Sequence, residues 1–484
     1  MSLRNQAISG VKWTALQQIS NQIISLVISI ILARLLLPEE FGLIGMIAIF
    51  IAIGNLMMQS GMTSSIIRSK TLDNDDYTTV FYFNLAIGIL MYLLLYISAP
   101  LIAGFYNQEI LTDIIRVYAF IFILQAFAAV QYAYLNRIMN FKKLMMISVP
   151  SLILAGITGI IMALKGYGVW SLVGYKLSQA FFNAVFYWFG SRWRPNGKFD
   201  KNKFKIHFDF GYKLSISGLI DTIFKNLYSV IIGKFFPVAQ VGFYQRANSL
   251  QQLPTQSISM IISKVSYPLF SKIQDDDSRL KNAYKKILKI IVFVLTPVLI
   301  ILGILATPLF RFLFTEKWLP AVPYFQILLV AGILYPIHAY NLNIVKVKGR
   351  SDIFLKLEIL KKLIIIGVIF IAIQFGIYGL LYGIVFTSIT SFFINTYFSG
   401  KLIGYTTMEQ IRDIIPYIIL SALTGIIVYL SDFYIIGNNK PDIIRLIAGG
   451  LTGGIFYLFL SFLLKLQALK EIIVILQQRN HHGK

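Results

Sequence analysis

The feature that most constrains the fold is a series of continuous apolar segments, each about 20 residues long. A helix of that length crosses the roughly 30 Å hydrocarbon core of a bilayer. The segments lack the alternation of barrel strands, so helices are favoured. Only 13% of the residues are charged, whereas a soluble protein has about 25%. The sequence therefore predicts an all-α polytopic membrane protein.

We predict about fourteen transmembrane helices from these segments. The first, seventh and eighth of them are unusually polar. The predicted spans are 11–33, 41–64, 78–104, 113–135, 144–164, 169–189, 214–235, 241–265, 284–306, 321–343, 357–375, 377–398, 413–431 and 443–464.

An internal repeat relates the two halves of the chain. Residues 31–44 read ILARLLLPEEFGLI, and residues 231–244 read IIGKFFPVAQVGFY, so that Gly42 falls on Gly242 at an offset of 200. Six spans precede the second copy, and an even number predicts parallel repeats that form two lobes around a central cavity. The predicted divisions are an N-terminal six-helix lobe (1–190), a basic cytoplasmic linker (191–213), a C-terminal six-helix lobe (214–400), an extra helix pair (401–464) and a cytoplasmic tail (465–484).

The net charge of +23 follows membrane topology. Most of the 44 Lys and Arg fall in loops on one side, which the positive-inside rule assigns to the cytoplasm together with both termini. This placement excludes nucleic acid as the main partner. It predicts contact with anionic lipid, including headgroups beside the basic linker. The tail is expected to be an interfacial amphipathic helix or a continuation of the last span.

The composition offers few residues that could bind a metal or a cofactor. The chain has no cysteine, which excludes thiol catalysis, thiolate metal sites and disulfides. Its four histidines do not form a ligand pattern. We therefore expect no metal, no cofactor and no catalytic residue.

Polar side chains recur every three or four residues in the first, seventh and eighth spans, so each helix presents a polar stripe. Gln17 and Asn21 lie in the first stripe and Gln252 in the eighth span. Such amides can hold packed helices together, but this many are hard to satisfy in a dry core. The stripes favour a polar cavity between the lobes.

The charged residues inside or at the ends of the spans give this cavity a positive sign. Asp221 is a candidate for ion coupling, or it pairs with Lys225 four residues later on the same helix face. Snorkelling, salt bridging and interfacial anchoring remain alternative roles for the cations. The candidate cationic ligands are Lys225, Arg246, Lys176, Arg34 and Lys234. They predict a cargo with an anionic group.

The N-terminal stretch VKWTALQQISNQIISLVISIILARLLLPEEFGLIGMIAIF and GYGVWSLVGYKLSQ at 166–179 resemble the polysaccharide transporters, the Wzx-type flippases. That family belongs to the multidrug/oligosaccharidyl-lipid/polysaccharide exporter superfamily. The resemblance implies a bacterial inner-membrane protein that moves a polyprenyl-diphosphate-linked oligosaccharide from the inner to the outer leaflet. The oligosaccharide would be a repeat unit of O-antigen, capsule or exopolysaccharide. A polysaccharide polymerase and glycosyltransferases are candidate partners, and a monomer suffices for the cavity.

Four alternatives stay open from the sequence. A cation-coupled multidrug exporter would need several cavity carboxylates, and a flippase for a peptidoglycan or teichoic-acid precursor would share the same features. A membrane polymerase or glycosyltransferase could use the acidic clusters at 73–76 and 275–277, although helix-start charges explain these better. A structural scaffold would not explain the polar stripes.

Overall fold

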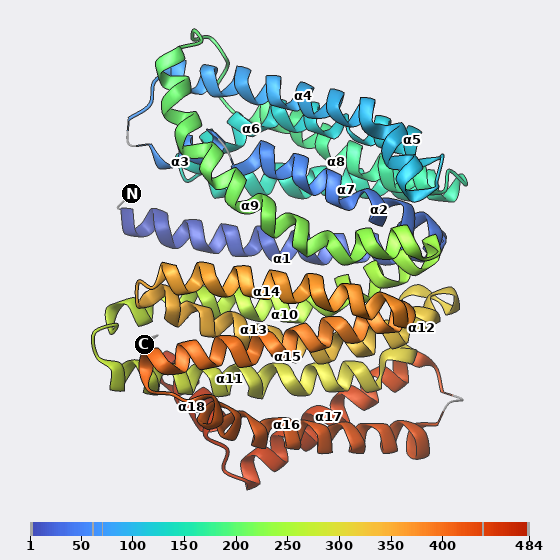
Figure 1. Ribbon diagram of the computed structural model, residues 1–484, viewed down its shortest axis with the longest axis vertical. Coiled ribbons are helices and arrows are strands. Elements are labelled where there is room, and N and C mark those ends of the chain that lie inside the picture. Colours follow the sequence, from blue (N-terminus) through green and yellow to red (C-terminus); the bar gives the residue numbers. More distant parts are fainter. Residues whose placement is uncertain (1–2, 61, 70, 438–439, 482–484) are drawn as a thin grey trace. The chain divides into compact units, whose positions relative to one another are not determined.

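The computed structural model describes residues 3–60, 62–69, 71–437 and 440–481. Within these ranges the regular structure is entirely helical (Figure 1). The chain divides into two compact units, Met1–Gln245 and Arg246–Lys484. Each unit is described by itself.

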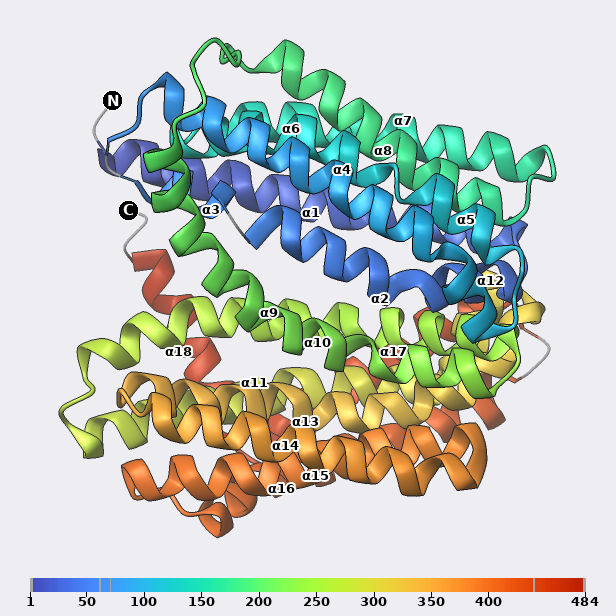
Figure 2. The same cartoon turned by 45° about the horizontal axis from the view of Figure 1, so that its top comes forward.

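The first unit is a bundle in which helices distant in the sequence pack together. α7 packs against both α1 and α8, α4 packs against α6, and α9 packs against α2, α3 and α4 (Figure 2). The helices are α1 (Leu3–Leu35), α2 (Pro38–Ser60), α3 (Met62–Arg68), α4 (Asn74–Tyr106), α5 (Leu111–Tyr118), α6 (Ile121–Arg137), α7 (Phe141–Leu164), α8 (Val169–Gly190), α9 (Lys201–Phe235) and the start of α10 (Val238–Lys272).

The second unit continues α10 and adds a layer of C-terminal helices. α13 packs against α15, and α11 packs against α13 and α16. The remaining elements are α11 (Asp277–Ile304), α12 (Ala306–Phe314), η1 (Glu316–Ala321), α13 (Val322–Val347), α14 (Ser351–Ala372), η2 (Ile373–Phe375), α15 (Gly376–Ile403), α16 (Thr407–Leu430), the π-helical η3 (Ser431–Ile436), α17 (Asp442–Leu463) and α18 (Gln467–His481).

Ten helical stretches in the described ranges are long and apolar enough to cross a membrane, which agrees with a multi-pass membrane protein. One of them, Ser351–Ile403, contains two predicted spans. The predicted spans in α8, α9 and α10 form long helices, but the ten stretches do not include them. α9 and α10 hold the amides and charges that made two of these spans look polar. The total of fourteen stays a prediction.

Two helices begin at capping boxes that the sequence encodes. The Asp73 carboxylate accepts from the backbone N–H of Asp75 and Asp76, and the Asp76 side chain accepts from the N–H of Asp73. Thr406 and Glu409 make the same exchange at the start of α16. Each box satisfies backbone donors that a helix start leaves unpaired, and so fixes where the helix begins.

The C-terminal helices of the second unit are held on α11 by charge and by apolar packing. Asp413 of α16 pairs with Lys285 at 2.9 Å and Lys289 at 3.1 Å, and Glu471 of α18 pairs with Lys286 at 3.0 Å. Ala468 is buried in the same core as Tyr284. The tail predicted at 465–484 is thus a helix whose apolar face is partly buried against protein; residues 482–484 lie outside the described ranges.

The predicted basic linker is partly helical, and part of it packs against the first unit. α9 begins at Lys201, so the second part of 191–213 is helical, and Trp193 is buried. The indole N–H of Trp193 donates to Asn74 Oδ1 at 2.7 Å. The first compact unit ends at Gln245, later in the chain than the predicted linker at 191–213. The reason is that α9 packs on helices of the first unit. The lobe boundaries stay a prediction.

Candidate functional site

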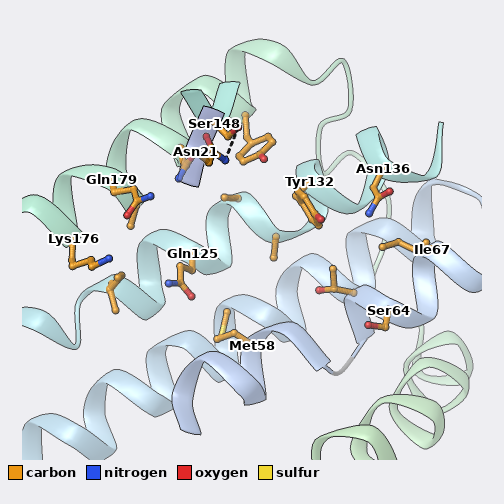
Figure 3. Close-up of a pocket in the computed structure, with 17 residues that line it drawn as sticks. Asn21, Met58, Ser64, Ile67, Gln125, Tyr132, Asn136, Ser148, Lys176 and Gln179 are labelled. Carbon is orange, nitrogen blue, oxygen red and sulfur yellow. Dashed lines mark hydrogen bonds between the residues drawn. The ribbon is translucent and has the colours of Figure 1, made fainter. Parts of the chain in front are cut away.

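The first unit contains a partly open cavity of about 690 Å³. Its walls come from six helices: α1, α2, α3, α6, α7 and α8 (Figure 3). The lining residues are Asn21, Met58, Thr63, Ser64, Ile67, Ile121, Gln125, Ala128, Ala129, Tyr132, Asn136, Ser148, Lys176, Gln179, Ala180, Asn183 and Tyr187.

One wall is a polar face of α6. Gln125, Tyr132 and Asn136 recur at intervals of seven and four residues, which places them in one row along a helix. Ala128 and Ala129 lie between them in the row and leave the space open, since their side chains end at Cβ. The other face of α6 buries Phe122 and Val130 in the bundle.

α8 forms the facing wall with the same periodicity. Lys176, Gln179 and Asn183 are spaced by three and four residues, and Figure 3 shows Lys176 and Gln179 on one side of that helix. Ala180 and Ala184 are small residues on α8 whose side chains are nearly buried. Amides from two helices therefore line one space.

Ser148 of α7 connects the cavity to the polar stripe of α1. Its hydroxyl accepts from Gln17 Nε2 at 2.9 Å. It also accepts from Asn21 Nδ2 at 3.5 Å (Figure 3). The Oδ1 atoms of Asn21 and Asn183 are buried and accept no hydrogen bond from the described residues. Buried acceptors of this kind gain most from a ligand that brings hydroxyl donors.

The cavity carries one positive charge. Lys176 is the sole ionisable cation among its described lining residues, and none of these residues is acidic. The Lys176 ammonium lies 4.9 Å from the ring centroid of Tyr175. A cation held among neutral amides, with no lining carboxylate, attracts an anionic group and disfavours a cationic one.

Two of the predicted site residues, Asn21 and Lys176, line this cavity, and Gln17 contacts it through Ser148. Lys225 and Asp221 are exposed on α9 and are not among the lining residues. Their predicted roles in binding and ion coupling stay predictions.

The remaining predicted ligands lie elsewhere in the two units. Arg34 is exposed near the end of α1, and Lys234 donates to the carbonyl oxygen of Phe105 at 2.6 Å. Arg246 is buried in the second unit, 4.8 Å from the ring centroid of Phe314 and 5.1 Å from that of Trp318. Gln252 donates to Asn248 Oδ1 on its own helix at 3.2 Å.

Sequence reasoning missed the polar faces of α6 and α8. Both helices are mostly apolar, so their few amides did not stand out as stripes. The signal was present as the row Gln125, Tyr132 and Asn136 and the row Lys176, Gln179 and Asn183. A search for isolated polar residues at helical spacing would have found them.

Comparison with known proteins adds a family and a fold. The sequence model of a family described as "Polysaccharide biosynthesis protein" matches residues 31–323. The chain is 27% identical to the teichuronic acid biosynthesis protein TuaB of Bacillus subtilis (strain 168), over 95% of this chain and 96% of TuaB. It is 26% identical to the lipopolysaccharide biosynthesis protein WzxC of Escherichia coli (strain K12), over 88% of this chain and 89% of WzxC.

Two solved structures share the fold at low identity. The lipid II flippase MurJ in an inward closed conformation aligns with a TM-score of 0.71 and 15% identity, over 93% of this chain and 98% of MurJ. An inward-facing multidrug resistance transporter of the MATE family, in the MOP superfamily, aligns with a TM-score of 0.61 and 17% identity, over 79% of this chain and 95% of the transporter.

Proposed function

The chain belongs to the polysaccharide biosynthesis protein family, and from this premise we propose that it is a flippase for a polyprenyl-diphosphate-linked oligosaccharide. It moves the repeat unit of a cell-surface polysaccharide between the leaflets of the bacterial inner membrane. The observation that carries the proposal is the amide-lined cavity, whose described lining holds one basic residue and no acidic residue. We assign the protein no catalytic step.

The cavity chemistry matches the head of such a lipid. A diphosphate is anionic and accepts hydrogen bonds, so Lys176 is its natural partner. Sugar hydroxyls both donate and accept, and so do the amides of Gln125, Gln179 and Asn183. The polyprenyl tail stays in the lipid, because it gains nothing from a polar cavity.

We propose that the fold consists of two parallel six-helix repeats and that transport proceeds by alternating access. Matching packing in the two units supports this architecture: α4 with α6 and α11 with α13, and then α6 with α8 and α13 with α15. α16 and α17 lie outside the repeat. The likeness to MurJ and to the MATE transporter supports a fold of this superfamily.

The distribution of Lys and Arg gives the orientation of the protein in the membrane, and the charge of the cargo gives the driving force for transport. With both termini in the cytoplasm, the membrane potential favours outward movement of an anion by about 2.3 kcal/mol per charge at 100 mV. A monomer is sufficient in this scheme. A polysaccharide polymerase and glycosyltransferases are the proposed neighbours in the pathway.

The names of the relatives favour this cargo class over the alternatives. TuaB is named for teichuronic acid, WzxC for lipopolysaccharide, and the succinoglycan biosynthesis transport protein ExoT of Rhizobium meliloti (strain 1021), 25% identical over 96% of this chain and 94% of ExoT, for another polysaccharide. A multidrug exporter that binds cations would need carboxylates, and none lines the described cavity.

Substitution of Lys176 tests the proposal. We expect Lys176→Gln to slow export of the lipid-linked oligosaccharide by about tenfold or more, because a charge-assisted hydrogen bond contributes about 1.5–3 kcal/mol. Lys176→Arg should retain most of the export. The measurement is the amount of lipid-linked intermediate that accumulates on the inner leaflet of cells in which the variant replaces the native protein.

Lys165→Gln is the matched control, since Lys165 is exposed at the end of α7 and is not a lining residue. It removes the same charge and should leave export unchanged. Full export by Lys176→Gln would contradict the proposed role of the cavity cation.

A further inference from the structure

The short helix α3 lies between the cavity and α9. Thr63, Ser64 and Ile67 of α3 line the cavity. The same helix packs against α9, and Figure 2 shows α3 beside the first half of α9. A bound ligand that displaces α3 would therefore also shift α9, because packed helices transmit strain through their contacts.

Two residues of α3 contact α9, three positions apart on the helix. The Ser65 hydroxyl lies 2.7 Å from His207 Nδ1, and the Arg68 guanidinium lies 4.7 Å from the ring centroid of Phe210. The first contact is buried: Ser65 is 5% exposed and His207 is 1% exposed. A polar contact at this depth fixes geometry, because leaving either partner unsatisfied costs about 1–3 kcal/mol.

His207 joins three helices at one point. Its second ring nitrogen, Nε2, lies 3.1 Å from Asp76 Oδ1 at the start of α4. Through its two ring nitrogens, one side chain of α9 thus contacts a hydroxyl of α3 and a carboxylate of α4.

A second set of contacts holds the start of α9 on α4. Lys203 pairs with Asp73 and lies 3.4 Å from Asp76 Oδ2. Its ammonium, together with hydrogen bonds from the capping box, lowers the pKa of Asp73 to about 2. Asp73 therefore stays ionised in any ordinary buffer, and the contact persists.

The connector before α9 adds hydrogen bonds from its backbone to α4. The N–H of Lys198 donates to Asp75 Oδ1 at 2.8 Å, and the N–H of Asp200 donates to Thr79 Oγ1 at 2.9 Å. The chain is thus fixed to α4 on both sides of the α9 start. Among the described partners of His207, Ser65 belongs to the helix that also lines the cavity, α3.

In sequence, Lys203 and His207 are specific to the second copy of the repeat. At the offset of 200 residues, Lys203 corresponds to Leu3 and His207 to Ala7, and neither residue of the first copy has a charge or a ring nitrogen. The two copies therefore differ in chemistry at the point where α9 meets α3 and α4.

We propose that α3 transmits occupancy of the cavity to α9, and that His207 is the positioning residue through which it does so. An occupied cavity displaces α3, which separates Ser65 from His207 and loosens the first half of α9. This inference rests on the proposed function for its ligand. His207 touches no ligand itself.

Disulfide formation between introduced cysteines tests the coupling between the cavity and α9. The chain contains no cysteine of its own that could react. One variant carries Ser65→Cys with His207→Cys, and a second carries Arg68→Cys with Phe210→Cys, which leaves His207 intact. The control is Met46→Cys with Gly233→Cys on α2 and the far half of α9, where a Cβ on Gly233 would lie 2.9 Å from Met46 Cγ. Each is reconstituted in liposomes, and its oxidation rate is measured with and without undecaprenyl diphosphate.

We expect undecaprenyl diphosphate to slow disulfide formation at both α3–α9 pairs by about tenfold, as the separated arrangement becomes dominant, and to leave the control pair unchanged. The disulfides at 65/207 and 68/210 should stop transport, and reduction should restore it. A merely structural contact would oxidise at the same rate with and without ligand.

Occupancy is followed separately by protection of Gln179→Cys, a cavity residue, from maleimide. Protection at 179 with unchanged rates at both α3–α9 pairs overturns the coupling and leaves the proposed function standing. Absence of protection at 179 overturns the proposed binding site and, with it, the coupling.

Discussion

At the scale of single residues, different side chains supply the charge and the hydrogen bonds of the cavity. Lys176 supplies charge, whereas Gln125, Gln179 and Asn183 supply hydrogen bonds without charge. Because the described lining contains no carboxylate, the positive field of Lys176 is not cancelled inside the cavity. Under the proposed function, the positive charge of this one residue selects for an anionic cargo.

A carboxylate placed beside Lys176 should weaken this preference. Gln179→Glu introduces an acid three residues from Lys176, where the two side chains can pair on one helix face. We expect the concentration of lipid-linked oligosaccharide needed for half-maximal transport to rise by about tenfold, which corresponds to 1.4 kcal/mol. The measurement is transport rate against cargo concentration in reconstituted vesicles.

Gln179→Met is the control, since it keeps the length of the side chain without the charge. It should shift the half-maximal concentration much less than Gln179→Glu does. Equal shifts for both variants would mean that the amide, and not the sign of the cavity, determines binding.

At the scale of helices, the two copies of the repeat motif meet at their glycines. A Cβ on Gly242 would lie 2.0 Å from the carbonyl oxygen of Pro38 and 3.3 Å from the backbone N of Gly42. A Cβ on Gly42 would lie 2.1 Å from the carbonyl oxygen of Val238. The starts of α2 and α10 therefore cross with their backbones in contact, which explains why both copies have glycine there.

Alanine at this crossing should destabilise the first unit. Neither clash can be relieved by a side-chain rotation, because the opposing atoms are backbone, so the helices must move apart. We expect Gly242→Ala to lower the free energy of unfolding by about 1–3 kcal/mol, measured by thermal or denaturant unfolding in detergent. Gly104→Ala is the control, since a Cβ there meets no atom within 4 Å. Equal stability of the two variants would show that the backbones at the crossing are not in contact.

The packing of α9 could not be predicted from the sequence. Its periodicity indicates a helix with a polar face, and the structure has that helix at Lys201–Phe235. The partners of a helix are set by shape and by contacts such as His207 with Ser65 and Asp76, which no local pattern encodes. The sequence predicts that the C-terminal lobe begins at residue 214, within α9, and that boundary stays a prediction; α9 itself packs within the first compact unit.

At the scale of the whole molecule, the fold class was predicted mainly from hydropathy and from the distribution of charge. Long apolar runs can only be helices in a bilayer, and the class of fold follows from that constraint. The cavity was harder to predict because its walls include α6 and α8, where a few amides stand among many apolar residues. Asn21 and Lys176 were found because one belongs to a dense stripe and the other is a charge within a span.

The proposed flippase moves an anionic lipid-linked oligosaccharide between leaflets, and this movement can be measured. The direct measurement uses purified protein in liposomes that contain a fluorescent undecaprenyl-diphosphate-linked oligosaccharide, with an enzyme outside that cannot cross the bilayer and that cleaves the sugar. We predict that the protected inner-leaflet pool disappears in the presence of the protein and disappears about tenfold more slowly with Lys176→Gln. Persistence of that pool with the native protein, together with transport of a cationic dye by the same liposomes, would contradict the account.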